Sequence, residues 1–202
     1  MRDSFDENGV VMRIVILGPP GVGKGTQAKR IAAKFDIPPI STGDIFRANV
    51  ENRTELGLLV DEIMKSGKYV PDEVTNDLVR NRLLEADCDG GFLLDGYPRT
   101  SAQVDELDTM LSGHDHHRLD VVLELTAPVE VLVDRLLKRA HTEGREDDSE
   151  DVIRHRLDVY NEQTAPLVHV YSDRGLLLTV DGTGDVDDVT ERLLTVLDNV
   201  KA

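Results

Sequence analysis

The sequence has little cysteine, few basic residues and no long apolar segment. Its single cysteine, Cys88, excludes an internal disulfide bond and any zinc site built from several cysteines. We expect this side chain to be a small buried apolar group. Lysine and arginine total 23 against 39 aspartate and glutamate residues, so the formal net charge is −16. Because nucleic-acid backbones are bound by basic surfaces, this balance argues against a nucleic-acid-binding protein, and we interpret the acidity as a contribution to solubility.

No apolar run approaches the ~20 residues that a helix needs to cross a membrane, which predicts a protein without a membrane partner. Residues 1–11 carry three acidic side chains and no apolar stretch, so they lack the pattern of a signal peptide. We therefore expect a cytoplasmic protein. We also expect a polar tail at 1–11 and one domain at 12–202, because a chain of 202 residues with 40% apolar content can bury one core.

Short apolar runs alternate with longer segments of helical pattern. The apolar runs are 14–17, 92–94, 121–125 and 176–180. The helical segments are 24–35, 71–86, 101–111, 128–139, 149–171 and 185–200. Uninterrupted apolar strands are typical of sheets that are covered on both faces. Strands that alternate with helices predict a parallel sheet with crossover helices, so the predicted fold class is α/β. We also expect a helix start near Pro71, a break at Pro166 and an exposed loop at 141–148.

The most informative local motif lies between the first apolar run and the first helical segment. Residues 18–26 read Gly-Pro-Pro-Gly-Val-Gly-Lys-Gly-Thr. Glycines let successive backbone N–H groups face an anion at a helix N-terminus, and Lys24 can then reach the terminal phosphates of a nucleotide. A simple turn with a solvated lysine is the alternative, but spacing, composition and context favour a phosphate-binding loop. Gly25 stands where the common pattern has Ser or Thr, which makes direct ligation of Mg²⁺ by Thr26 less secure.

This loop and three later segments resemble the adenylate kinase family, in the order expected for that family. The segments read GPPGVGKGTQA at 18–28, ISTGDIFR at 40–47, GFLLDGYPRT at 91–100 before Gln103, and RHRL at 154–157 before Tyr160, Thr164 and Pro166. The resemblance covers the chain from about residue 12. It implies the P-loop nucleoside monophosphate kinase fold, with an AMP-binding helical insertion at about 41–70 and a short lid at about 139–148. It also implies reversible, Mg²⁺-dependent conversion of ATP and AMP to two ADP by a monomer.

Site residues follow from the same resemblance. Arg47 and Arg99 would grip the AMP phosphate, which a guanidinium can bind in a bidentate way. Thr42, Gln103 and the backbone of 68–70 would bound the adenine of AMP. The implied substrate-binding set is Thr42, Arg47, Lys68, Tyr69, Val70, Gly96, Tyr97, Pro98, Arg99, Gln103, Arg145 and Arg156.

The ATP side is implied in the same way. Arg135 and Arg139 are four residues apart, hence on one helix face, and would form an ATP-side pair. Asp95 would hold hydrated Mg²⁺, although a helix cap or a turn is an alternative role. Gly184 would offer a backbone contact to the ATP base. The implied ATP-binding set is Gly21, Val22, Gly23, Lys24, Gly25, Thr26, Arg135, Arg139 and Gly184. The implied catalytic set, which neutralises the charge of the transferring phosphoryl group, is Lys24, Arg99, Arg139, Arg145 and Arg156.

The lid is predicted to be short and free of zinc. Only residues 140–144 separate Arg139 from Arg145, which leaves no room for a small β-domain, and this segment has no cysteine. Three histidines, at positions 114, 116 and 117, form a cluster of the kind that can bind metal. With a glycine and an aspartate among them, they are interpreted more simply as a solvated loop.

Three other functions compete with this prediction. A UMP or CMP kinase would share the fold and the phosphate chemistry; Thr42 and Gln103 favour AMP, because the pyrimidine relatives tend to have a smaller residue and an Asn there. A P-loop switch without kinase activity would not need Arg47, Arg99 and Arg156 for two nucleotides. A structural or interaction protein would leave all the motifs unexplained.

Overall fold

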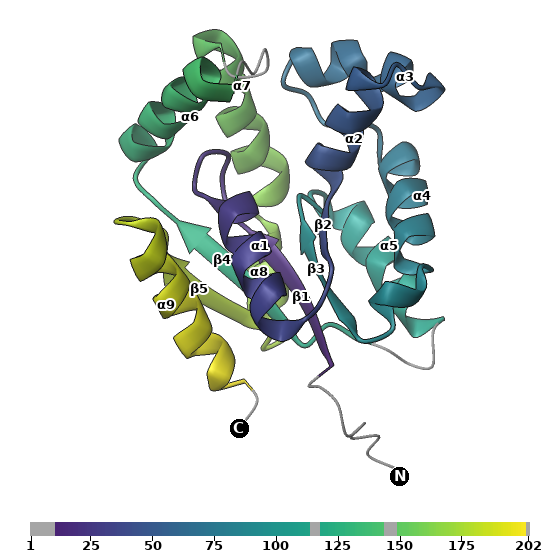
Figure 1. Ribbon diagram of the computed structural model, residues 1–202, viewed down its shortest axis with the longest axis vertical. Helices are drawn as coiled ribbons and strands as arrows, with labels where there is room; N and C mark the ends of the chain where they lie inside the picture. The colour runs from purple at the N-terminus through teal and green to yellow at the C-terminus, as the bar shows by residue number, and fades with distance from the viewer. Residues whose placement is uncertain (1–10, 114–117, 144–148, 201–202) are drawn as a thin grey trace.

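The computed structural model describes residues 11–113, 118–143 and 149–200 (Figure 1). In this part of the chain one parallel sheet has five strands in the order β2-β3-β1-β4-β5. The strands are β1 (Met12–Leu17), β2 (Pro39–Ser41), β3 (Gly91–Asp95), β4 (Val121–Thr126) and β5 (Leu177–Asp181). The predicted α/β class with a parallel sheet is confirmed.

Both faces of the sheet are buried, as the uninterrupted apolar strands predicted. On β1, Ile14 and Ile16 belong to one core cluster, whereas Val15 and Leu17 belong to another. The first cluster is completed by α1 (Lys24–Phe35), α6 (Val129–Glu143), α7 (Glu150–Val159) and α9 (Val186–Asp198). The second is completed by α4 (Asp72–Leu83), α5 (Ser101–Ser112) and α8 (Leu167–Asp173). The Cys88 side chain is buried in the second cluster, as expected, and this burial raises its pKa to about 11.

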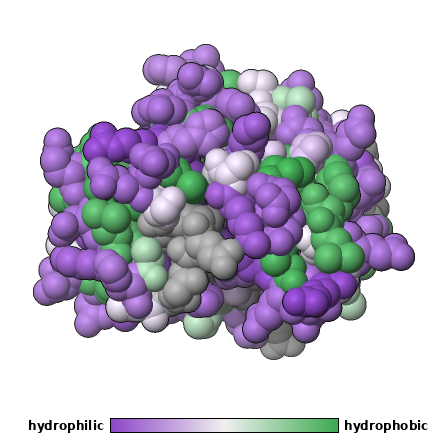
Figure 2. All heavy atoms as spheres, turned by 90° about the horizontal axis from the view of Figure 1, so that it is seen from above, coloured by the Kyte–Doolittle hydropathy of each residue, from purple (hydrophilic) through white to green (hydrophobic). Residues whose placement is uncertain are grey.

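Two pairs of helices extend beyond the sheet at the end where the strands finish. One pair is α2 (Thr42–Glu51) and α3 (Glu55–Lys65), which enclose a small apolar cluster of their own. The other pair is α6 and α7, on the opposite side of the molecule (Figure 1). Seen from above, this end is mostly hydrophilic, with apolar atoms in smaller patches (Figure 2). The end of the molecule where the strands finish therefore presents a largely polar surface.

Several element boundaries differ from the sequence prediction. The exposed loop expected at 141–148 is wrong for residues 141–143, because α6 continues to Glu143. No glycine or proline occurs in this helix to end it earlier, and the Thr142 hydroxyl bonds back to the Lys138 carbonyl at 3.1 Å. Residues 144–148 of that expected loop lie outside the described residues, as do residues 1–10 of the expected tail. Near Pro71 the prediction is confirmed, since α4 begins at Asp72 with acidic residues in its first turn.

The break expected at Pro166 is confirmed, but it begins before the proline. Helix α7 ends at Val159, a π-helical turn (Tyr160–Thr164) follows, and α8 starts at Leu167. Proline has no N–H for the helical ladder and its ring crowds the preceding turn. The wider turn is closed by a hydrogen bond from the Ala165 N–H to the Tyr160 carbonyl at 2.9 Å. Such π turns often occur at functional sites, and this one places Thr164 in the wall of one of the pockets described below.

Candidate functional site

The glycine-rich loop follows the central strand β1, whose neighbours are β3 and β4. From β1 the chain passes through α1 to β2 on one side of the sheet, and β4 and β5 lie on the other side. Ligands of open parallel sheets bind at such a point, beyond the carboxyl ends of the strands. Gly23 caps α1 with φ of 108°, a conformation that residues with a Cβ rarely adopt. The first N–H groups of α1 therefore form an anion site at the end of β1.

Lys24 lies over the loop that it follows. Its Nζ donates to the carbonyl oxygens of Gly18 at 2.7 Å and Pro19 at 3.0 Å. Loss of solvent around the ammonium group lowers the pKa of Lys24 to about 8, although the Asp95 carboxylate acts in the opposite sense. Three nearby guanidinium groups lower it further, those of Arg99, Arg156 and Arg139. Such a concentration of positive charge in a protein of net charge −16 indicates a site for a strongly anionic ligand.

Two adjoining pockets lie on either side of the loop. Pocket A is bounded by α2, the segment 67–70, the residues after β3, and the π-helical turn. It contains most of the predicted AMP-side residues, namely Thr42, Arg47, Lys68, Tyr69, Val70, Gly96, Pro98, Arg99, Gln103 and Arg156. Pocket A therefore brings together residues from four distant segments of the chain.

Pocket B lies along α1, α6 and the start of α9. It contains all the predicted ATP-side residues, Gly21, Val22, Gly23, Lys24, Gly25, Thr26, Arg135, Arg139 and Gly184, together with Asp95. The basic residues that line both pockets are Lys24, Arg47, Arg99 and Arg156. The two pockets thus share a positively charged boundary, at which two anionic groups can meet.

Arg99 is fixed by four contacts at this boundary. Its Nε donates to the Gly96 carbonyl at 2.7 Å, and its guanidinium lies over the Tyr69 ring at 4.8 Å from the centroid. Its backbone N–H donates to Gln103 at 2.8 Å, and its carbonyl accepts from the Thr164 hydroxyl at 2.9 Å. Because Nε takes the carbonyl, the two terminal nitrogens of the guanidinium can face a phosphate.

Thr42 and Gln103 both lie in pocket A, but their polar atoms already have protein partners. The Thr42 hydroxyl donates to the Gly96 carbonyl at 3.0 Å. The Gln103 side chain accepts from the Arg99 N–H and donates to an Asp72 carboxylate oxygen at 2.7 Å. Both residues are buried. They therefore fix the wall of pocket A, and each keeps unused hydrogen-bonding capacity, one amide hydrogen on Gln103 and acceptor capacity on the Thr42 oxygen.

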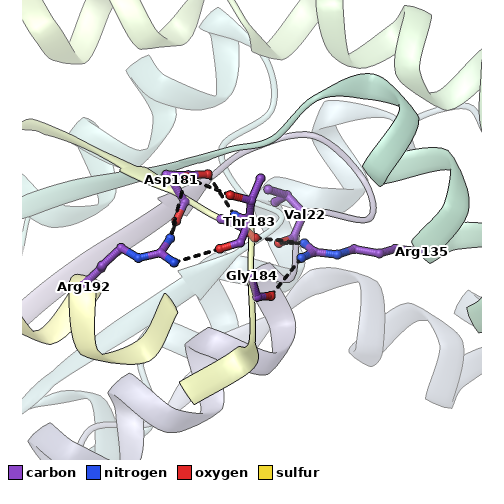
Figure 3. A network of polar contacts seen from close by, with 7 residues as sticks. Val22, Arg135, Asp181, Thr183, Gly184 and Arg192 are labelled. Atoms are coloured by element: carbon purple, nitrogen blue, oxygen red, sulfur yellow. Dashed lines mark hydrogen bonds and ion pairs between the residues drawn. The ribbon is translucent and has the colours of Figure 1, made fainter. Parts of the chain in front are cut away.

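The arginines expected on the AMP side and on the ATP side have different hydrogen-bond partners. Arg47 forms an ion pair with Asp44 on the same helix. Arg135 donates to three backbone carbonyls, those of Val22 at 3.1 Å, Gly182 at 3.0 Å and Gly184 at 3.4 Å (Figure 3). Arg135 thus joins the glycine-rich loop to the segment that follows β5, a structural contact that the sequence did not reveal.

Some predicted residues are placed elsewhere or are not described. The Tyr97 side chain lies in the core, with its hydroxyl donating to Asn76 at 2.8 Å, so any substrate contact by this residue would come from its backbone. Arg145 and the three histidines at 114, 116 and 117 lie outside the described residues. Tyr160 and Thr164 line pocket A without having been assigned a role. Their presence in the segment after RHRL was the available signal.

Metal-binding and membrane-spanning features were also sought. Across residues 11–113, 118–143 and 149–200, no group of three or more His, Cys, Asp or Glu side chains is arranged to hold a metal ion. The predicted absence of zinc remains a prediction. In the same part of the chain, no helix has both the length and the apolar character needed to span a membrane.

Comparison with known proteins agrees with this geometry. The family model described as adenylate kinase matches residues 16–176. A protein of Kocuria rhizophila named adenylate kinase is 59% identical over 186 residues, covering 92% of this chain and 98% of its own. Another adenylate kinase, from a Nocardioides species, is 60% identical over 187 residues, covering 93% and 97%. A third, from Renibacterium salmoninarum, is 57% identical over 190 residues, covering 94% and 98%. With its phosphate-binding loop between two basic pockets, the chain belongs to the adenylate kinase family.

Proposed function

We propose that this enzyme transfers a phosphoryl group reversibly between ATP and AMP, giving two ADP. The observation that carries the proposal is the shared boundary of pockets A and B, which Lys24, Arg99 and Arg156 all line. Phosphoryl transfer depends mainly on bringing the two reactants into line and on neutralising the charge of the transferred group. A basic boundary between two adjoining pockets can perform both tasks.

Pocket A is assigned to AMP. Arg99 offers its two terminal nitrogens to the phosphate, because its Nε is held by Gly96. Arg47 would supply a second guanidinium, because its ion pair with Asp44 is made through one terminal nitrogen and leaves other N–H donors for the phosphate. Thr42, Gln103 and the backbone of 68–70 would bound the base. Tyr160, which is buried and lines the same pocket, adds an aromatic surface to it.

Pocket B is assigned to ATP. The N–H groups at the start of α1 would cradle the phosphates. Lys24 has three N–H donors, of which two bond to loop carbonyls, so a third can face a phosphate oxygen. Arg139 and Arg156 line the pocket on the side of α6 and α7. Arg145 is assigned to the same clamp by resemblance. Arg135 and Gly184 would lie beside the adenine base of ATP.

Magnesium is assigned to the phosphate end of pocket B. Asp95 ends β3 with only 9% of its surface exposed, and it lines this pocket close to Lys24. One carboxylate beside a phosphate site suits Mg²⁺, which proteins hold through one or two carboxylates together with water and substrate phosphates. Bound Mg²⁺ would neutralise charge on the phosphates of ATP. Thr26 also lines the pocket, at one position beyond the usual hydroxyl ligand.

The proposed domains are a core, an AMP-binding insertion at about 41–70 and a short lid at about 139–148. The insertion corresponds to α2, α3 and the segment up to Val70, which line pocket A on one side. The short lid would close over pocket B, but it would exclude water less completely than a larger lid does. A monomeric state and a cytoplasmic location remain predictions.

The second candidate is a UMP or CMP kinase, which would use the same phosphate contacts. Base choice depends on the few residues around Thr42 and Gln103, whose positions are fixed by bonds to Gly96 and Asp72.

The experiment mixes the protein with Mg²⁺, ATP and each of AMP, UMP and CMP, and follows diphosphate formation. Of the three monophosphates, we expect only AMP to give rapid ADP formation from ATP. Folded protein that forms no ADP would refute the proposal, and faster turnover with UMP or CMP would favour the second candidate.

A further inference from the structure

Four consecutive backbone carbonyls, beginning at the last residue of β5, accept hydrogen bonds from two arginines. They belong to residues 181–184, here named the β5–α9 loop (Figure 3). Arg192, on α9, donates from Nη1 to the Asp181 carbonyl and from Nη2 to the Thr183 carbonyl, the latter at 2.9 Å. Arg135 takes the two alternate carbonyls, at positions 182 and 184. The loop is therefore held from both sides by guanidinium groups.

The loop is also bonded internally. The Asp181 carboxylate accepts from the Thr183 backbone N–H at 2.9 Å and from its hydroxyl at 2.8 Å. These bonds, with smaller contributions from Arg192 and Arg135, lower the pKa of Asp181. The Gly182 N–H donates to Thr126, at the end of β4, at 2.8 Å. With its donors and acceptors committed in this way, the loop has one well-defined conformation.

The two arginines differ in what else they can touch. Arg135 lines pocket B together with Gly182 and Gly184. Arg192 and Asp181 instead line a shallow groove formed by β5 and α9, and neither lines pocket B. The bond from Arg135 to Gly184 is the longest of its three, at 3.4 Å, and a ligand in pocket B can compete for Arg135. Arg192 is not subject to that competition.

We propose that Arg192 is a positioning residue for the base of the nucleoside triphosphate. It would hold the β5–α9 loop so that the backbone at Gly184 meets the base at a fixed place. A carbonyl at that place accepts a hydrogen bond from the amino group of adenine but repels the carbonyl oxygen of guanine, so loop position controls the choice between ATP and GTP. This inference rests on the proposed assignment of pocket B to ATP.

The geometry calls for an arginine at position 192. Two nitrogens of one planar group meet carbonyls that are two residues apart, whereas a lysine has a single ammonium on a flexible stem. The contact is close, because a Cβ on Gly184 would lie 3.2 Å from Nη2 of Arg192. An Arg192→Gln side chain is shorter and can reach at most one of the two carbonyls. Removal of the guanidinium therefore removes the hydrogen bonds that hold the loop to α9.

The test compares Arg192→Gln and Arg192→Lys with the wild type by calorimetric binding of ATP, GTP and tripolyphosphate. Tripolyphosphate has the phosphates of ATP but no base, so it reports on the glycine-rich loop alone. We expect ATP affinity to fall about three- to tenfold in Arg192→Gln, consistent with one or two lost hydrogen bonds, and less in Arg192→Lys. Tripolyphosphate affinity and the KM for AMP should not change, and the preference for ATP over GTP should narrow.

The matched control is Arg174→Gln. Arg174 also pairs with a carboxylate, that of Asp108 at 2.8 Å, and lines neither pocket A nor pocket B. It should leave all three affinities unchanged. Asp181→Asn supplies a second variant of the loop, in case Arg192→Gln lowers stability, and should shift ATP affinity in the same direction.

Two results would overturn the inference. One is an unchanged ATP affinity and ATP-to-GTP ratio in folded Arg192→Gln and Asp181→Asn. The other is an equal loss of ATP and tripolyphosphate affinity, which would place the effect on phosphate binding. Failure of the wild type to bind ATP or to form ADP would instead refute the proposed function, and the inference with it.

Discussion

The hydroxyl of Thr164 donates to the backbone carbonyl of Arg99 at 2.9 Å, and this bond joins segments that are 65 residues apart in the sequence. The same hydroxyl oxygen lies 2.7 Å from the hydroxyl of Tyr69, whose ring is covered by the Arg99 guanidinium. Thr164 is only 4% exposed. The π-helical turn therefore positions the arginine that we assign to the AMP phosphate.

Loss of this bond should affect the AMP side of the reaction. In Thr164→Val the volume is nearly conserved but the Arg99 carbonyl and the Tyr69 hydroxyl lose their shared partner. We expect kcat/KM for AMP to fall about tenfold, as the loss of two hydrogen bonds predicts, with little change in the KM for ATP. Thr164→Ser should restore the activity. The control is Thr109→Val, whose hydroxyl donates to the Asp105 carbonyl within α5, and steady-state kinetics equal to wild type in Thr164→Val would contradict the prediction.

The shape of the Arg99 side chain should matter more than its charge. Arg99→Lys keeps the charge but loses the Nε bond to Gly96 and the planar fork over Tyr69. We expect kcat and kcat/KM to fall together, by about 10–1,000-fold, because the lost contact is made mainly in the transition state.

Arg80→Lys is the matched control, since Arg80 pairs with an exposed carboxylate on α4 and a half-buried one on α5. It should have normal kinetics. A rise in the KM for AMP alone in Arg99→Lys would mean that the contact is equally strong in the ground state. Kinetics close to wild type, with an unchanged melting curve, would show that the geometry at position 99 is dispensable.

The sequence predicted the elements whose signals are local. Helix α1 has the bounds that its periodicity gave, because a glycine-rich loop precedes it and an apolar face runs through it. Strand β2 was not predicted from the apolar pattern, since it has only three residues and begins with Pro39. The helices α2 and α3 were expected only through the family resemblance, because no turn separates α2 from β2 and the apolar face of these helices is small.

The site was predicted as a set of residues but not as a set of contacts. The pockets contain nearly all the described residues that the motifs suggested, because three of the four motifs contain or follow strands that end at the same edge of the sheet. The contacts of Arg135 with three carbonyls and of Thr164 with Arg99 join segments far apart in the sequence. No sequence pattern encodes such contacts, since they depend on how α6 and the π-helical turn pack against the loops.

The packing of α2 against α3 should not tolerate a side chain at Gly57. A Cβ there would lie 2.0 Å from the Asn49 carbonyl oxygen and 2.7 Å from the Val50 nitrogen, and both are backbone atoms. Gly57→Ala must therefore separate the two helices, at a cost of about 1–3 kcal/mol. For a domain of this size, the melting temperature should fall by about 2–4 °C per kcal/mol in thermal unfolding.

The control for this change is Gly113→Ala, at the end of α5. Its nearest neighbours would be 3.6 Å from the new Cβ, and its φ of −72° suits any residue. Gly113→Ala should melt within about 1–2 °C of the wild type, as a strain-free surface change predicts. Equal melting temperatures for Gly57→Ala and the wild type would show that α2 and α3 are less closely packed than described.

The lowered pKa of Lys24 should make nucleotide binding depend on pH. Its value of about 8 follows mainly from loss of solvent around the ammonium group. Bound phosphates favour the charged form and should raise this pKa. Well below pH 8 the ammonium is charged with or without ATP, so binding exchanges no proton with it. Above pH 8 the free protein has lost the proton and the complex regains it, so the affinity should fall by up to about tenfold per pH unit.

Calorimetry in two buffers of different ionisation enthalpy measures this proton directly. With ATP and EDTA, so that no Mg²⁺ contributes, we expect the proton uptake due to Lys24 to be near zero at pH 7 and to rise toward about one proton per ATP near pH 9. Lys24→Met serves as the reference, because it lacks the titrating group but keeps every other ionisable side chain. The difference in uptake between the wild type and Lys24→Met isolates the lysine. The same uptake in both proteins at pH 9 would mean that Lys24 does not change its charge when ATP binds, and would contradict the prediction.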